Sequence, residues 1–435
     1  MFETIKNAFK VKEIRKKIFI TLLLLLVYRL CCYIPVPGLN SDEFSSVVTG
    51  NNFLSLMSAV TGGALAQGTL FALGIGPYIN ASIIMQLLCV GIPALERLSK
   101  QGEEGKKKIS QITRFMTLLL AVVQAIGVIL TFGNEAINTS FFWDQTWLAY
   151  IFMVIVYSAG ALLTMWLGER ITEYGVGNGI SLIIFVGIIS TAGQTLVSTF
   201  MSAFGTEFDF TPILQVIIFC VLSVILFTLI VTVDLAERRI PVQYAKQVKG
   251  RKMYGGQATV IPIKISGSGV MPLIFAFAII SLPDLIMGLF FADSTAYANY
   301  TEWFSGGQGN LGWLYILVLC LLIFAFSFFY AQIQFNPEDV SKSIQQNGGF
   351  IPGIRPGRPT ADYLKKISNR ITLFGAIFLS LVAFVPSLVF SIVGNSDLLS
   401  VFSTTGILIV VSVALEFDKQ LQSQLMMKNY KGFLK

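Results

Sequence analysis

The sequence contains no histidine and few charged residues. Only 13% of its 435 residues are Asp, Glu, Lys or Arg, whereas about a quarter are charged in an ordinary soluble domain. Without histidine the chain cannot build a His-ligated zinc site, a Ser-His-Asp triad or a histidine proton relay. The five cysteines lie in apolar runs without a CxxC spacing, so we expect them to be small buried residues. We therefore expect that this chain is not an enzyme and holds no metal ion or cofactor.

What the sequence has in excess is apolar surface. Hydrophobic residues make up 54% of the chain, and the mean hydropathy is +0.72. Runs of about twenty apolar residues recur, and such a run spans the hydrocarbon of a bilayer at about 1.5 Å per residue. The pattern predicts an all-α polytopic membrane protein with ten transmembrane segments, at about residues 18–34, 70–92, 113–132, 147–167, 179–200, 212–233, 270–291, 311–335, 370–393 and 398–417.

The Lys and Arg residues orient these segments. All but one of the 31 basic residues fall in the N-terminal leader, in the C-terminal tail or in loops that follow even-numbered segments. The charged residues of the opposite loops are all acidic. By the positive-inside rule both termini are expected in the cytoplasm. The exception is Arg29, near the end of the first segment.

A short apolar stretch at about residues 53–66 lies between the first two segments. It is rich in small residues, contains the pair Gly62-Gly63 and is too short to cross a bilayer. One interpretation is a segment that re-enters the membrane from outside, which requires protein or a water-filled cavity around it. The alternative is an interfacial helix on the surface, and composition does not distinguish the two.

Three cytoplasmic stretches carry turn or strand signals. The run Gly175–Gly179 has no strand before it and no Lys-Ser/Thr after it, so we interpret it as a tight turn and not as a phosphate loop. Residues 239–244 alternate between apolar and polar, which predicts a hairpin. In 350–359 three prolines and two glycines fix the backbone on both sides of Arg355. This rigidity favours a docking role for Arg355 over a charge that only sets topology.

Seven motifs are spread in order along the chain: Pro35-Val36-Pro37-Gly38, Ala72–Ile79, Ala81–Ile84, Lys100–Glu103, Trp166–Glu169, Gly175–Ser181 and Pro352–Gly357. In these motifs the chain resembles the bacterial SecY family, whose members are the channel subunit of the Sec protein translocase. Each motif alone is weak, but seven in register are specific, and together they cover nearly the whole chain.

The resemblance implies two five-helix halves, related by a pseudo-two-fold axis in the membrane plane, around a central pore with a re-entrant plug helix. The implied divisions are a cytoplasmic amphipathic segment (1–17), an N-terminal half (18–200, with the plug at about 53–66), an external linker (201–211), a C-terminal half (212–417, with cytoplasmic loops at about 234–266 and 336–369) and a cytoplasmic tail (418–435).

The resemblance also implies a ring of apolar side chains at the waist of the pore. An apolar constriction opposes a continuous water wire and has no fixed charge to trap a passing polypeptide. Without the family, the same isoleucines would be interpreted as ordinary packing. The matching positions are Ile75, Ile79, Ile180, Ile184, Ile274 and Ile409.

A plug and a lateral gate complete the implied channel. At the gate, a sufficiently apolar segment leaves for the lipid, whereas a polar one passes across the membrane. Leu282 stands where some relatives carry a polar residue, which weakens a polar cluster there. The plug positions are Leu56, Met57, Ser58, Ala59, Val60, Thr61, Gly62 and Gly63, and the gate positions are Asn80, Gln86, Gln124 and Leu282.

The implied function is a protein-conducting channel of the bacterial cytoplasmic membrane for unfolded secretory polypeptides, signal sequences and transmembrane segments. No Walker motif occurs, so energy must come from a partner. The implied partners are the SecE and SecG subunits, the SecA motor ATPase, the ribosome, signal peptides, nascent chains and lipid. The alternative is a secondary transporter of a small solute, which needs convergent polar groups at the midplane. The expected docking residues are Arg238, Arg239, Lys249, Arg251, Lys252, Arg355 and Arg358.

Overall fold

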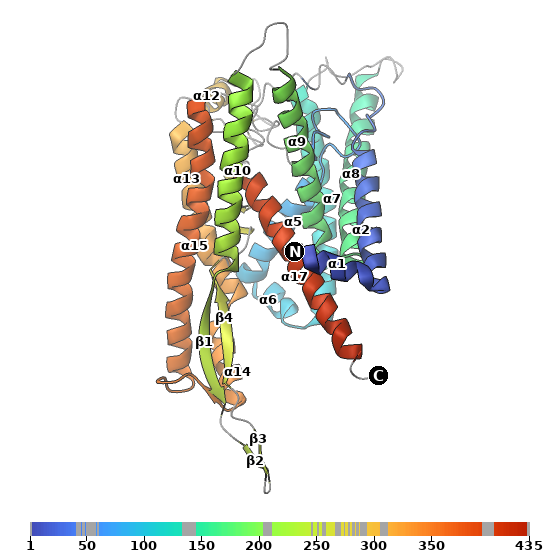
Figure 1. Ribbon diagram of the computed structural model, residues 1–435. Helices are drawn as coiled ribbons and strands as arrows, with labels where there is room; N and C mark the ends of the chain where they lie inside the picture. The colour runs from blue at the N-terminus through green and yellow to red at the C-terminus, as the bar shows by residue number, and fades with distance from the viewer. Residues whose placement is uncertain are drawn as a thin grey trace.

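The computed structural model is a helical bundle with a small sheet at one end (Figure 1). It describes residues 2–40, 45, 48, 58, 61–132, 145–202, 211–244, 247–249, 252–254, 258–265, 271–273, 275–276, 279–280, 283, 287, 294–304, 312–393 and 404–432. The first half of the chain forms α1 (Phe2–Lys10), α2 (Lys12–Cys31), α5 (Gly76–Gly91), α6 (Pro93–Ser99), α7 (Glu103–Phe132), α8 (Thr146–Tyr174) and α9 (Gly179–Ser202). The second half forms α10 (Thr211–Leu235), β1 (Glu237–Tyr244), β2 (Gln247–Lys249), β3 (Lys252–Tyr254), β4 (Ala258–Lys264), α12 (Thr295–Phe304), α13 (Gly312–Gln334), α14 (Pro337–Gln346), β5 (Gly349–Phe350), α15 (Arg358–Val393) and α17 (Thr404–Gly432).

The helices form two groups (Figure 1). In one group α7 packs against α5 and α8, and α8 also contacts α2 and α9. In the other group α15 packs against α13 and α10. Helix α17 crosses obliquely between the groups and contacts α9, α10 and α15. The last helix of the chain therefore joins its two halves.

Six helices in the described residues are long and apolar enough to cross a membrane, or seven if the bent pair α5 and α6 counts as one span. They coincide with predicted segments 2 to 6, 8 and 9, while α2 and α17 occupy the first and tenth. Predicted segment 7, at 270–291, falls largely outside the described residues. The prediction of an all-α multi-pass membrane protein is confirmed, and the number ten stays a prediction.

Helix α5 begins later than the apolar run predicts. The run starts at residue 70, but residues 70–75 form turns and the helix starts at Gly76. Pro77 lies in its first turn, where a missing backbone N–H costs nothing and the fixed φ favours a helix start. At the other end, α5 and α6 are bent by 105°, with Pro93 opening the second helix.

Two loops of the second half join into one sheet, with strand order β4-β1-β5. Strands β1 and β4 are antiparallel over Glu237–Gln243, and β2 and β3 form a smaller hairpin beyond them (Figure 1). The predicted hairpin is thus confirmed. Strand β5 comes from the other loop and pairs Phe350 with Gln243. A core that includes Ile240, Ile344 and Leu364 lies beneath this sheet and fixes it to α14 and α15.

The turn between α8 and α9 depends on close backbone packing. A Cβ added to Gly179 would lie 2.0 Å from the carbonyl oxygen of Gly168, so only glycine fits between the two helices. The amide of Val176 donates to the Thr21 hydroxyl at 3.0 Å, which also binds the turn to α2. The interpretation of 175–179 as a tight turn is consistent with this packing.

We predict that Gly179→Ala destabilises the protein by about 1–3 kcal/mol, because the added methyl group must separate α8 from α9. The measurement is thermal unfolding of the purified chain in detergent. Gly193→Ala in the same helix is the matched control, since a Cβ there meets nothing within 4 Å. Equal unfolding midpoints for the two variants would contradict the proposed packing.

Candidate pore, gate and docking surface

Five of the six predicted ring isoleucines lie in one hydrophobic cluster. The buried members are Ile75, Ile184 and Ile409, with exposed fractions of 4%, 5% and 5%. Ile79 and Ile180 are half-buried and pack against them. These residues come from the starts of α5, α9 and α17, so the cluster lies where elements from both halves of the chain meet. The sixth position, Ile274, lies outside the described residues.

The described part of the predicted plug is buried inside the protein. Ser58 and Thr61 are 7% and 4% exposed. The Ser58 carbonyl accepts from the amide of Gly63 at 2.8 Å, and the Thr61 hydroxyl accepts from the amide of Leu65 at 3.3 Å. Ala64 is a member of the cluster that holds the ring isoleucines. This burial favours the re-entrant interpretation over a surface helix for these residues. Four predicted plug positions lie outside the described residues: Leu56, Met57, Ala59 and Val60.

The predicted gate residue Gln86 of α5 contacts a residue that the sequence did not point to. The hydroxyl of Tyr330 on α13 donates to the Gln86 side-chain oxygen. The Tyr330 ring also packs on Phe275, with ring centroids 4.7 Å apart, and both join Ile83 of α5 in one cluster. An apolar seam with one hydrogen bond therefore connects the two helix groups. Tyr330 stands in a Phe-rich run, and no local sequence signal marks it.

The other predicted gate positions do not join this hydrogen bond. Asn80 is half-buried on α5, and Leu282 lies outside the described residues. Gln124 of α7 is 7% exposed, and its side-chain oxygen has no hydrogen-bond partner in the described part of the chain. The structure thus brings Gln86 to the seam and leaves a three-member polar cluster without support.

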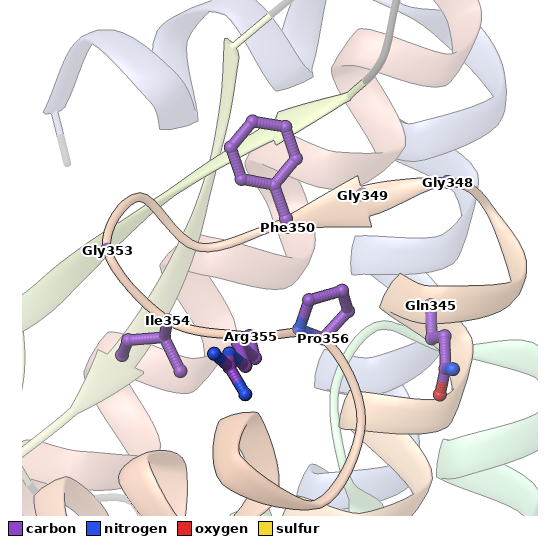
Figure 2. A pocket seen from close by; sticks show the side chains of 8 residues that line it. All are labelled: Gln345, Gly348, Gly349, Phe350, Gly353, Ile354, Arg355 and Pro356. Atoms are coloured by element: carbon purple, nitrogen blue, oxygen red, sulfur yellow. The ribbon is translucent and has the colours of Figure 1, made fainter.

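Arg355 projects from a turn whose backbone is fixed from several sides. The turn leaves β5 at Phe350 and returns to α15 (Figure 2). The Thr360 hydroxyl donates to the Arg355 carbonyl at 2.8 Å, and the Ser341 hydroxyl donates to the Gly357 carbonyl at 2.7 Å. The Arg355 side chain itself is exposed, at the edge of a shallow pocket. The fixed backbone and the exposed side chain fit a docking residue.

The remaining predicted docking residues lie at the same end of the molecule where the structure describes them. Arg238 and Arg239 are exposed on β1, and Arg358 is exposed at the start of α15. Arg239 forms an ion pair with Glu237, with Nε and Oε1 2.8 Å apart. Lys249 and Lys252 face each other across the β2–β3 pair. Their side chains, and all of Arg251, lie outside the described residues. Because β1 pairs with β5, Arg238 and Arg239 on β1 and Arg355 in the turn after β5 lie beside the same sheet.

The base of the sheet is also connected to α17. Lys419 of α17 pairs with Asp234 at the end of α10, with Nζ and Oδ2 2.9 Å apart. Burial, and then the charge of Lys419, lowers the pKa of Lys264 on β4. Because α17 also carries Ile409, this ionic group lies between the docking surface and the isoleucine cluster.

The pattern of the SecY family matches residues 69–417 of this chain. The chain belongs to the SecY family. A relative from Streptomyces galbus, named protein translocase subunit SecY, is 42% identical over 448 residues that cover 100% of both chains. The sequence resemblance to SecY is therefore confirmed.

Solved SecY-family structures share this fold. A SecY structure in which the plug domain stabilises the closed state of the translocation channel superposes with a TM-score of 0.68 at 21% identity, over 95% of this chain and 93% of that one. Sec61 in the canine ribosome-channel complex gives a TM-score of 0.64 at 20% identity, over the same shares of the two chains. At these identities the likeness establishes the SecY fold.

We predict that Tyr330→Phe weakens the contact between α5 and α13 without changing its apolar packing, because the substitution removes only the hydroxyl that binds Gln86. A hydrogen bond of this kind contributes about 0.5–1.5 kcal/mol. Transport of a secretory protein with a weakened signal sequence should therefore rise several-fold. Gln86→Leu should raise this transport by a similar factor. The double variant should transport little faster than either single variant, because both substitutions remove the same hydrogen bond. Additive effects would show that the two residues act independently.

Proposed function

We propose that this SecY-family chain conducts unfolded secretory polypeptides across the bacterial cytoplasmic membrane and releases signal sequences and transmembrane segments sideways into lipid. The observation that carries the proposal is the convergence of Ile75, Ile184 and Ile409 from separate parts of the chain into one buried cluster. Together with Ile79, Ile180 and Ile274 they would form the waist of the pore. Apolar walls exclude hydrated ions at rest and accept side chains of any sequence during transport.

The plug and the gate follow from the same cluster. Residues 53–66 would fill the outer funnel at rest, since their described part packs against the ring. The seam between α5, Phe275 and α13 would be the lateral gate, because it joins the two helix groups by few polar contacts. An apolar client segment at that seam can partition between protein and lipid.

Energy would come from partners on the cytoplasmic sheet. Exposed arginines on β1 and on the Arg355 turn suit acidic surfaces of the SecA motor and phosphates of ribosomal RNA alike. One structural relative is Sec61 in a ribosome-channel complex, which supports the ribosome as one partner. SecE and SecG would flank the helix bundle, and both termini would lie in the cytoplasm beside the sheet.

The test is transport by proteoliposomes that contain this chain with SecE, SecG, SecA and ATP. We predict uptake of an unfolded secretory protein, and a loss of at least about tenfold in Arg355→Glu, because a central arginine contact becomes a repulsive one. Arg355→Lys is the matched control and should retain part of the transport. Amount and thermal stability of the inserted variants should match the unaltered chain, because the Arg355 side chain is exposed.

One result would contradict the proposed channel, and another would contradict the proposed docking role of Arg355. Uptake of a small solute without uptake of the secretory protein would favour the transporter alternative. Full transport by Arg355→Glu would remove this residue from the docking surface while leaving the channel itself in place.

A further inference from the structure

Arg29 is the single basic residue that the charge pattern leaves outside the cytoplasmic side, and the structure places it against Gly62, Ser190 and Tyr33. Its Nη1 donates to the carbonyl oxygen of Gly62 at 3.0 Å. Its Nη2 donates to the hydroxyl of Ser190 on α9. Its guanidinium carbon lies 5.5 Å from the centroid of the Tyr33 ring. One side chain on α2 therefore connects the backbone of the plug region to α9.

Gly62 allows this contact because it has no side chain. Its φ is +75°, and a Cβ there would lie 2.4 Å from Arg29 Nη1 and 3.1 Å from the Cα of Gly187 on α9. The turn around it is internally bonded, since the next amide, that of Gly63, donates to the Ser58 carbonyl at 2.8 Å. The Gly62 carbonyl that Arg29 binds thus belongs to a turn that is held together by its own hydrogen bond.

The α9 partners lie on the helix face that continues from the isoleucine cluster. Ile184, Gly187, Ser190 and Gln194 follow one another at spacings of three or four residues, so they share one face. Ser190 lies about 9 Å along the helix from Ile184 at 1.5 Å per residue. The Gln194 amide donates to the Tyr33 hydroxyl at 3.3 Å, one turn beyond the Arg29 contact. Arg29 of α2 and Tyr33, just beyond the end of α2, therefore both bind this face of α9.

We propose that Arg29 is a positioning residue that latches the segment 61–68 to α9 and so keeps the idle channel closed. This inference rests on the proposed function of the chain as a channel. Hydrogen bonds from a guanidinium are charge-assisted and strengthen where water is scarce. Withdrawal of the segment breaks the Gly62 bond, and separation of α2 from α9 breaks the Ser190 bond. Opening therefore requires Arg29 to release at least one partner.

The first test is hydrogen exchange of the full chain in lipid nanodiscs. In Arg29→Gln, the backbone amides of residues 63–69 should exchange about tenfold faster, because the turn loses its charged anchor. Peptides from α8 should keep their exchange rates. Arg114→Gln is the matched control, since it removes another interhelical arginine contact, to Glu169 at 2.9 Å, away from the segment. It should leave residues 63–69 unchanged.

The second test is transport in the proteoliposomes described above. Arg29→Gln should carry a secretory protein with a weakened signal sequence several-fold faster than the unaltered chain, with little change for a strong signal sequence. Ser190→Ala removes only the α9 partner and should shift both readouts in the same direction to a smaller extent. If Arg29→Gln does not fold, Ser190→Ala decides both tests.

The latch would be overturned if hydrogen exchange at residues 63–69 were unchanged in folded Arg29→Gln. It would also be overturned if this exchange became faster while the requirement for a strong signal sequence stayed the same. Exchange does not depend on transport. A chain that transports no secretory protein, with or without the substitution, would contradict the proposed function, while the exchange result would still decide whether Arg29 holds the segment.

Discussion

Apolar contact among isoleucines at the meeting point of α5, α9 and α17 is the constraint on which the rest of the structure depends. Ile79 belongs both to this cluster and to the seam around Phe275 and Tyr330. The proposed waist and the proposed gate therefore share a side chain, so the seam around Phe275 and Tyr330 cannot part without changing the packing of the isoleucine cluster. Close-packed apolar groups switch between discrete arrangements more readily than they deform continuously, which suits a channel with closed and open states.

Polar contacts surround this apolar centre at both ends. At one end, Asp234 and Lys419 connect the base of the sheet to α17, the helix that carries Ile409. At the other end, Arg29 joins the segment 61–68 to the face of α9 that carries Ile184. Polar contacts therefore connect the isoleucine cluster both to the sheet and to the segment 61–68. Each polar contact has two discrete states, bonded and broken.

The sequence predicted features that depend on local pattern. Apolar runs indicated the spans, and alternation in 239–244 predicted strand β1. The start of α5 was missed by a few residues, although Pro77 marks it, because hydropathy does not separate an apolar turn from an apolar helix. The resemblance to SecY, and not spacing, singled out Ile75 and Ile409, which lie far apart in the chain.

Long-range contacts were beyond the sequence. Tyr330 and Gln86 are 244 positions apart, and no periodicity connects them. The pairing of β5 with β1 joins two loops that the sequence treats separately. Arg29 was visible as a lone charge in an apolar run, but its partners are a backbone carbonyl and a hydroxyl, which no charge pattern reveals. The resemblance implied Gln124 at the gate, whereas the structure buries Gln124 on α7, where its side-chain oxygen has no hydrogen-bond partner among the described residues.

The most direct test of the central claim is the ion conductance of the idle channel in planar bilayers, with Ile75, Ile184 and Ile409 all replaced by serine. The account predicts a steady leak, since hydroxyls allow water and ions through the waist. The matched control replaces Ile151, Ile155 and Ile189, which are 50%, 61% and 46% exposed, and should stay sealed. A tight membrane with the first variant, or an equal leak with the second, would contradict an isoleucine seal.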